Sequence, residues 1–204
     1  MTITWLGHSC MKISENGYSV ICDPFAPGFP QGFDTINETA DAVFCSHDHG
    51  DHNFKDGVKI VSSGAPAFEF KFVDTFHDDK DGTLRGPNKV CVMKAPSGQV
   101  AVHLGDLGHI PTDAQLEAIG KVDVLMIPVG GFFTIDAETA KKVCELIAPR
   151  IIIPMHYSGE GFGIDVLAKV DDFAKLFDKS EVTYLASREL DIDDKTAGVK
   201  IFKY

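Results

Sequence analysis

Short apolar runs separated by glycine-containing turns dominate the start of the chain. Residues 2–6, 10–14 and 18–22 each have the length and apolar content of a strand. The second and third runs are joined by a turn containing Asn16-Gly17, a pair that favours a two-residue hairpin. The pattern therefore predicts an antiparallel meander that opens the fold.

Alternation of polar and apolar positions predicts further half-buried strands. Over residues 67–76, one face carries the aromatic residues Phe68, Phe70 and Phe72. The other face carries the charged residues Glu69 and Lys71. Residues 90–94 and 99–104 flank a Pro-Ser-Gly turn and form two more strand-like runs. The first half of the chain is therefore predicted to be rich in β-structure.

From residue 111 the spacing of apolar residues becomes helical. Thr112 and Gln115 have capping-box spacing and Gly120 suits a helix C-terminus, so a first helix is predicted between them. Apolar positions over 137–148 predict a second helix. A third helix is predicted to begin at Asp165, with an apolar stripe formed by Val166, Val170, Phe173 and Phe177.

Strand-like runs alternate with these helices, at residues 122–127, 151–153, 182–185 and 199–202. Strands followed by alternating strands and helices are typical of packed sheets with helices outside, which is a layered α/β fold. The chain has 204 residues and contains no repeat, linker or low-complexity tract. We therefore expect one domain spanning residues 1–204.

Composition and charge restrict the class of protein. An apolar content of 44% and a charged content of 24% are ordinary for a globular domain. No apolar stretch is long enough to cross a bilayer and no basic leader precedes the first strand, so we expect a cytoplasmic protein without membrane insertion. Five scattered cysteines without a C-x-x-C pair indicate buried reduced thiols. A net charge of −11, spread along the chain, argues against nucleic acid as a partner.

The densest chemical signal is His47-x-His49-x-Asp51-His52, which directly follows the apolar run 42–45. Imidazole and carboxylate together suit Zn²⁺, Fe or Mn. His47 and His49 can direct their rings to one ion, whereas the adjacent Asp51 and His52 point elsewhere and would serve a second. The alternative is a hydrophilic surface turn, but such a turn has no structural need for three imidazoles within six residues.

Other polar residues also stand just past apolar runs, at Asp23, Asp106 and His156. In layered α/β proteins, ligand sites gather in the loops at the carboxyl ends of strands. We therefore expect these side chains to converge on the histidine motif.

The motif and its surroundings resemble the metallo-β-lactamase superfamily. The shared segments are H-x-H-x-D-H after a strand, Trp5-Leu6-Gly7-His8-Ser9, Cys22-Asp23-Pro24, Leu104-Gly105-Asp106 and Ile153-Pro154-Met155-His156-Tyr157. The chain is most similar to the single-domain branch that contains ascorbate-phosphate lactonases and phosphodiesterase-like hydrolases. This resemblance implies a four-layer αββα sandwich.

The resemblance also implies a dinuclear metal site. His47, His49 and His77 would hold one ion, Asp51, His52 and His156 the other, and Asp106 would bridge them. His103 competes with His77 for the first set. The implied cofactors are two divalent cations, with zinc expected first and manganese or iron as alternatives.

Several residues are predicted to act on a small-molecule substrate. Arg85 lies in a glycine-rich loop and suits a carboxylate or phosphate, although a solvated loop arginine is the alternative. His8 and Tyr157 are candidate hydrogen-bond donors to the substrate. Asp51 is expected to orient the nucleophile besides binding metal. Asp23 would either orient a ligand imidazole or cap a turn.

Three functions follow from these residues. The first is a hydrolase in which two ions activate water against a lactone, ester, amide or phosphodiester, and the absence of a G-x-S-x-G motif agrees with it. The second is a non-heme iron redox enzyme of the same fold. The third is a metal-binding module without turnover. A homo-oligomer is a further expectation, because a neighbouring subunit could complete the cleft.

Overall fold

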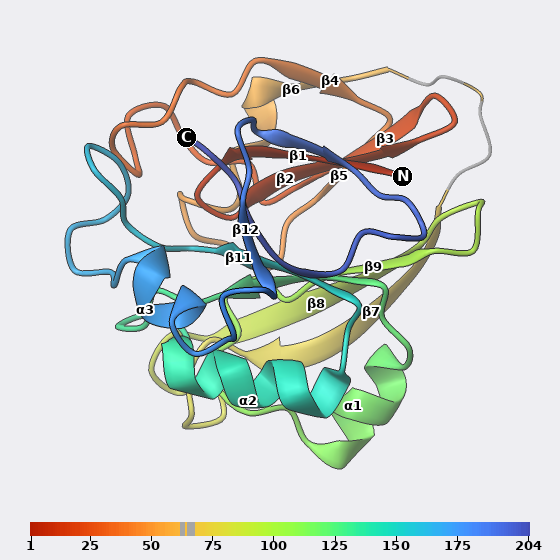
Figure 1. The fold of residues 1–204 in the computed structure, drawn as a ribbon. Coiled ribbons are helices and arrows are strands. Elements are labelled where there is room, and N and C mark those ends of the chain that lie inside the picture. Colours follow the sequence, from red (N-terminus) through yellow and green to blue (C-terminus); the bar gives the residue numbers. More distant parts are fainter. Residues whose placement is uncertain (62–63, 65–67) are drawn as a thin grey trace.

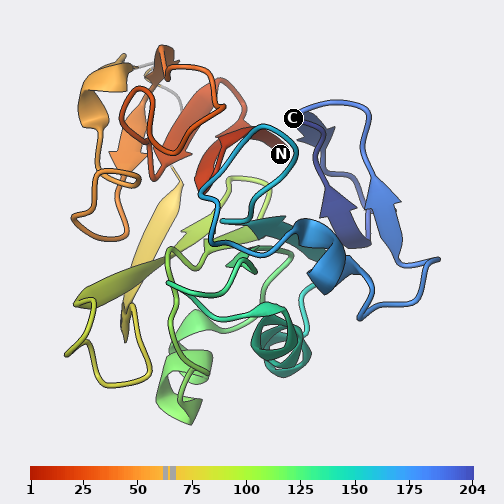
Figure 2. The same ribbon diagram turned by 90° about the vertical axis from the view of Figure 1, so that its left-hand side faces the viewer.

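Two β-sheets pack face to face in the computed structural model, which describes residues 1–61, 64 and 68–204 (Figures 1 and 2). The five-stranded sheet has the order β13-β1-β2-β3-β5. Its strands are β1 (Thr2–Gly7), β2 (Cys10–Glu15), β3 (Tyr18–Cys22), β5 (Ala42–Phe44) and β13 (Glu189–Asp191). The buried side chains of both sheets form one hydrophobic core.

The predicted meander is confirmed. Strands β1, β2 and β3 pair antiparallel, and Glu15 pairs with Tyr18 at the end of the β2–β3 hairpin. Asn16 and Gly17 both have left-handed backbone, with φ values of 52° and 82°. This is the conformation that a two-residue hairpin turn requires, and it explains why Asn-Gly stands there.

The seven-stranded sheet has the order β12-β14-β11-β10-β9-β8-β7. Its strands are β7 (Glu69–Phe76), β8 (Pro87–Lys94), β9 (Val100–His103), β10 (Val124–Pro128), β11 (Ile151–Met155), β12 (Val182–Tyr184) and β14 (Gly198–Ile201). The run from β9 to β12 is parallel. Every residue of β10 and β11 is buried, as expected for parallel strands covered on both faces.

The α-helices lie outside the seven-stranded sheet (Figure 1). They are α1 (Asp113–Ile119), α2 (Ala137–Ile147) and α3 (Val170–Ala174). The capping box of Thr112 and Gln115, the end of α1 at Gly120 and the position of α2 are confirmed. No helix in the described part of the chain has the length and apolar content that spanning a membrane would require.

The third helix is shorter than predicted. It begins at Val170, not at Asp165. The backbone before it is engaged by neighbouring loops, because the Ala168 N–H donates to the Gly130 carbonyl and the Ser158 N–H donates to the Ala168 carbonyl. These tertiary hydrogen bonds replace the ladder that a helix over this segment would need.

The outer side of the five-stranded sheet departs from the αββα order in detail. Beside β3 and β5 lie a short parallel pair, β4 (Glu38–Ala40) with β6 (Val58–Ile60), and the 3-10 turn η1 (Lys55–Gly57) (Figure 1). Over residues 1–61, 64 and 68–204, α-helices therefore cover only the seven-stranded sheet.

The strand predicted over 67–76 is present as β7, and its first predicted residue, Ala67, lies outside the described residues. Of the three aromatic residues predicted on one face, only Phe68, directly before β7, is buried. Phe70 and Phe72 are exposed, whereas Val73 and Thr75 are buried. Strand β7 is at the edge of its sheet, so only the part next to α1 is covered.

Candidate metal centre

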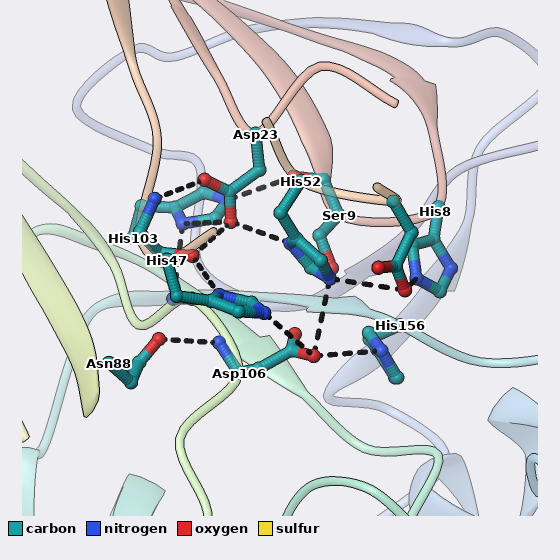
Figure 3. Close-up of polar contacts among 12 residues, drawn as sticks. His8, Ser9, Asp23, His47, His52, Asn88, His103, Asp106 and His156 are labelled. Carbon is teal, nitrogen blue, oxygen red and sulfur yellow. Dashed lines mark hydrogen bonds and ion pairs between the residues drawn. The ribbon is translucent and has the colours of Figure 1, made fainter. Parts of the chain in front are cut away.

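Six residues of the candidate site stand one to three residues past the ends of strands. They are His8 after β1, Asp23 after β3, His47 after β5, His77 after β7, Asp106 after β9 and His156 after β11. Figure 3 shows side chains from both sheets directed toward one another around Asp106. The expectation that strand ends bring these residues together is met by the geometry.

Backbone strain is concentrated at these strand ends. His8, Asp23 and His156 have φ values of 49°, 49° and 54°, in the left-handed region that side chains with a Cβ disfavour. Gly105, at φ 56°, precedes Asp106, and a Cβ there would collide with Asn88 and Ser46. Such strain costs on the order of 1–3 kcal/mol per residue and persists where a functional geometry depends on it.

Asp106 lies at the centre of the cluster. Its Oδ2 atom is 3.1 Å from His156 Nε2, 3.2 Å from both His52 Nε2 and His77 Nε2, and 3.9 Å from His47 Nε2. Burial opposes ionisation of this carboxyl, but the His156 and His52 imidazoles outweigh burial and hold its pKa well below the usual range. One carboxylate thus faces four imidazoles.

The ligand atoms form two groups that share this carboxylate. The first contains His47, His49 and His77, and the second contains His8, Asp51, His52 and His156. Atoms within each group lie within 4.8 Å of one another, and His47, His52 and Asp106 form a further group of this kind. The division matches the two implied sets, with His8 added to the second.

The structure brings His77, and not His103, to His47 and His49. The His103 ring is buried and points elsewhere. Its Nε2–H donates to the Ser9 carbonyl at 2.8 Å, and its Nδ1 accepts from the Gly105 N–H at 3.1 Å. His103 therefore supports the loop before Asp106.

The donor atoms of the cluster fit a transition-metal cation. Buried atoms directed into it have no hydrogen-bond partner among the described residues, namely Nε2 of His8, His47, His52 and His156 and Oδ1 of Asp106. An unpaired buried polar atom costs about 1–3 kcal/mol, and cations held by the two ligand groups would satisfy these atoms. Burial lowers the pKa of His47 to about 3, so at neutral pH its lone pair is available to a metal.

Asp23 orients two of the candidate ligands, His52 directly and His47 through Ser46. Its Oδ2 accepts from His52 Nδ1 at 2.9 Å and from the Ser46 hydroxyl at 2.6 Å. The same hydroxyl lies 2.8 Å from His47 Nδ1. These bonds leave Nε2 of both imidazoles directed at Asp106 (Figure 3). The geometry agrees with the orienting role, not with a turn cap alone.

Replacing Asp23 by asparagine is expected to lower metal affinity about 10- to 100-fold, because His52 loses its charged acceptor. Competition for Zn²⁺ with a chromophoric chelator measures the change. Asp34→Asn is the matched control, since Asp34 pairs with Arg188 at the surface. Unchanged affinity in Asp23→Asn would show that the imidazoles are oriented by packing alone.

Asn88 is a site residue that the sequence patterns did not single out. Its Oδ1 accepts from the Asp106 N–H at 2.9 Å, and its Nδ2 donates to the Leu104 carbonyl at 2.9 Å and to Thr75 Oγ1 at 2.8 Å. The available signal was a polar residue at a buried position of a strand. Asn88 thereby holds the loop that carries Asp106.

The predicted substrate-binding residues have different positions. Arg85 lines a cleft of about 300 Å³ together with His49 and Asp51, and its Nη2 donates to the Phe132 carbonyl at 2.9 Å. Tyr157 is not in the cleft.

The Tyr157 ring is buried and stacks on Trp5 with centroids 5.5 Å apart. Burial, followed by Asp171, raises the pKa of its hydroxyl. The prediction that Tyr157 contacts substrate is therefore not supported, because its ring is part of an aromatic core. Adjacency to His156 in sequence does not place it in the site, since His156 turns the chain in a left-handed conformation.

Two packed sheets with a cluster of His and Asp suited to cations at their strand ends are typical of a class of metal-dependent enzymes. A profile of the β-lactamase superfamily domain matches residues 2–156 of this chain. The chain belongs to the metallo-β-lactamase superfamily, among its UPF0173 metal-dependent hydrolases. The family and fold predicted from the sequence motifs are thus confirmed.

Individual relatives agree with this assignment. A UPF0173 metal-dependent hydrolase of Carboxydothermus hydrogenoformans is 32% identical, over 78% of this chain and 85% of the relative. One from Pyrococcus abyssi is 29% identical, over 92% and 97%. A Thermotoga maritima crystal structure, assigned to the Zn-dependent hydrolases of this superfamily, has a TM-score of 0.75 and 35% identity, and covers 98% of this chain and 97% of that one.

Proposed function

We propose that this metal-dependent hydrolase uses two divalent cations to cleave a small ester-like substrate of the lactone or phosphodiester class. The observation that carries the proposal is the pair of ligand groups that share Asp106. A carboxylate suits this bridging position because each of its oxygens can bind one cation.

The donor types favour zinc, with manganese or iron as alternatives. The assignment of the Thermotoga maritima protein to Zn-dependent hydrolases supports zinc. His47, His49 and His77 would hold one cation, and Asp51, His52 and His156 the other. When bound, such cations lower the pKa of a water molecule and polarise the substrate oxygen under attack.

Asp51 is the residue of this chain best placed to orient the attacking water. Its Oδ2 lies 3.4 Å from His8 Nε2 and 3.5 Å from His52 Nε2, and its side chain is partly exposed to the cleft. Burial opposes ionisation, but the neighbouring His52 and His8 imidazoles outweigh burial and lower the pKa of Asp51 below the usual range. Asp51 is therefore a carboxylate at neutral pH and can accept a proton from water.

The cleft favours a compact substrate with an apolar part and an anionic part. Its apolar lining comes from Phe29, Leu84, Phe133 and Ile164. The positively charged side chain in its lining is Arg85. Guanidinium binds a carboxylate or phosphate strongly. An anion can be accepted locally although the chain carries a net charge of −11, because Arg85 lines the cleft and bound cations would add positive charge there.

A substrate panel tests the proposal. Lactones, phosphodiesters and acyl thioesters are incubated with the protein loaded with Zn²⁺, Mn²⁺ or Fe²⁺, and product is quantified. We expect turnover of lactones or phosphodiesters with two ions bound per chain. Oxygen uptake by the iron form without hydrolysis would instead indicate a redox enzyme, and saturable binding without product would indicate a binding module.

The compartment and assembly expected from the sequence remain part of this proposal. The five cysteines are free thiols and four are buried, which agrees with a reducing compartment such as the cytoplasm. A homo-oligomer in which a second subunit borders the cleft stays a prediction, which sedimentation of the metal-loaded protein would test.

A further inference from the structure

His8 occupies a position that the two implied ligand sets leave unexplained. It directly follows β1, and its side chain is fully buried next to Asp51, His52 and His156. Its Nε2 lies 3.4 Å from Asp51 Oδ2, and its ring centroid lies 4.2 Å from that of His156 and 5.5 Å from that of His52 (Figure 3). Because it is sealed from solvent, it is not placed to bind substrate in the open cleft.

The chain holds this ring in place through its backbone. The Trp5 indole N–H donates to the His8 carbonyl at 2.9 Å, and the His156 N–H approaches the same oxygen at 3.4 Å. The preceding Gly7 packs so tightly that a Cβ there would lie 2.9 Å from the Phe33 ring carbon Cγ. These contacts maintain a left-handed backbone that a buried histidine with no special role would not require.

His8 differs from His103, an ordinary core histidine, in the hydrogen-bond partners of its ring nitrogens. Both side chains are fully buried. Both ring nitrogens of His103 have backbone hydrogen-bond partners, whereas neither ring nitrogen of His8 has one among the described residues. Buried imidazole nitrogens are normally paired, so the His8 ring lacks a partner that the folded chain does not supply.

We propose that His8 is a fourth side-chain ligand of the cation held by Asp51, His52 and His156, and that this site fills before the other. The inference rests on the dinuclear function proposed above. The second group then contributes four ligands besides the shared Asp106, and the first contributes three. One of those three, His49, is exposed. More ligands and deeper burial give the second site the higher affinity.

Metal titration of the full chain tests this assignment. Protein stripped with chelator is titrated with Zn²⁺ by calorimetry, for the unchanged chain, His8→Asn and His49→Ala. We expect His8→Asn to weaken the tighter of two binding steps at least 10- to 100-fold, the loss known for weakened metal support. His49→Ala should weaken the other step. Asparagine is chosen because it tolerates the left-handed backbone at this position.

A spectroscopic readout distinguishes a ligand from a positioning residue. One equivalent of Co²⁺ reports its ligands through its visible absorption, so His8→Asn should change the spectrum, whereas Asp34→Asn, at a surface ion pair, should leave it unchanged. His8→Gln repeats the measurement if the asparagine variant does not fold.

Each outcome decides between the two proposals. Two Zn²⁺ ions bound with unchanged affinities and an unchanged Co²⁺ spectrum in His8→Asn would overturn the role of His8 and leave the dinuclear function intact. A weaker step with an unchanged spectrum would also overturn it. If the unchanged chain binds one ion only, the dinuclear proposal fails, and dependence of that single step on His8 still decides the ligand assignment.

Discussion

Alanine at both His47 and Asp106 is expected to abolish metal uptake and hydrolysis together. Asp106 faces both ligand groups and His47 belongs to the first, so the double variant leaves neither group complete. Bound cations supply several kcal/mol of transition-state stabilisation, and each 1.36 kcal/mol is tenfold in rate. We therefore expect kcat/KM to fall by about 10³-fold or more.

Elemental analysis of the purified variant and its turnover of the best substrate from the panel measure both effects. Glu117→Ala is the control, because Glu117 is an exposed acidic residue on α1 and lies outside the cluster. Retained hydrolysis in the double variant would refute the metal-dependent mechanism. Loss of activity with two ions still bound would show that these side chains act on the substrate and not on the cations.

The sequence was sufficient to predict what local chemistry determines. The hairpin at Asn16-Gly17 and the capping box at Thr112 depend on a few neighbouring residues, and both are present. Convergence of Asp23, Asp106 and His156 on the histidine motif followed from their positions after strands. Strand ends at one edge of a sheet lie close together regardless of the length of chain between them.

Features that depend on packing between distant segments were not predictable. The start of α3 depends on hydrogen bonds from the loops around Ser158 and Gly130. The burial of Tyr157 depends on Trp5, far away in sequence. His8 was assigned to substrate because its type suits hydrogen bonding, and only the tertiary structure shows that its ring is sealed against His156. Asn88 carries no motif and acts through the backbone of Asp106.

Arg85 is held in position before any substrate arrives. The carboxylate of Asp78 accepts from four backbone N–H groups of the loop, with distances of 2.8 Å to Lys80, 2.9 Å to Gly82, 3.0 Å to Leu84 and 2.8 Å to Arg85. Burial opposes this charge, but the N–H groups, that of Arg85 first, lower the Asp78 pKa to about 2. The loop therefore remains organised at neutral pH.

Replacing Arg85 by glutamine should therefore slow the hydrolysis of anionic substrates and leave that of neutral substrates unchanged. A hydrogen bond to a charged group contributes about 1.5–3 kcal/mol, which corresponds to about a 10- to 100-fold loss in kcat/KM. The measurement compares two lactones of the same shape, one with a carboxylate and one with a neutral amide in its place. We expect kcat/KM to fall only for the lactone with the carboxylate, because the neutral lactone has no charge for Arg85 to bind and contacts this part of the cleft through its apolar lining.

Lys80→Gln is the matched control within the same loop, since Lys80 pairs with Asp79 at the surface and does not line the cleft. Its kinetics should equal those of the unchanged chain. Arg85→Lys keeps the charge but lacks the planar fork that reaches both the Phe132 carbonyl and a substrate anion, so we expect an intermediate loss. Equal losses on both lactones would assign Arg85 to holding the two loops together, and no loss on either would remove it from the substrate site.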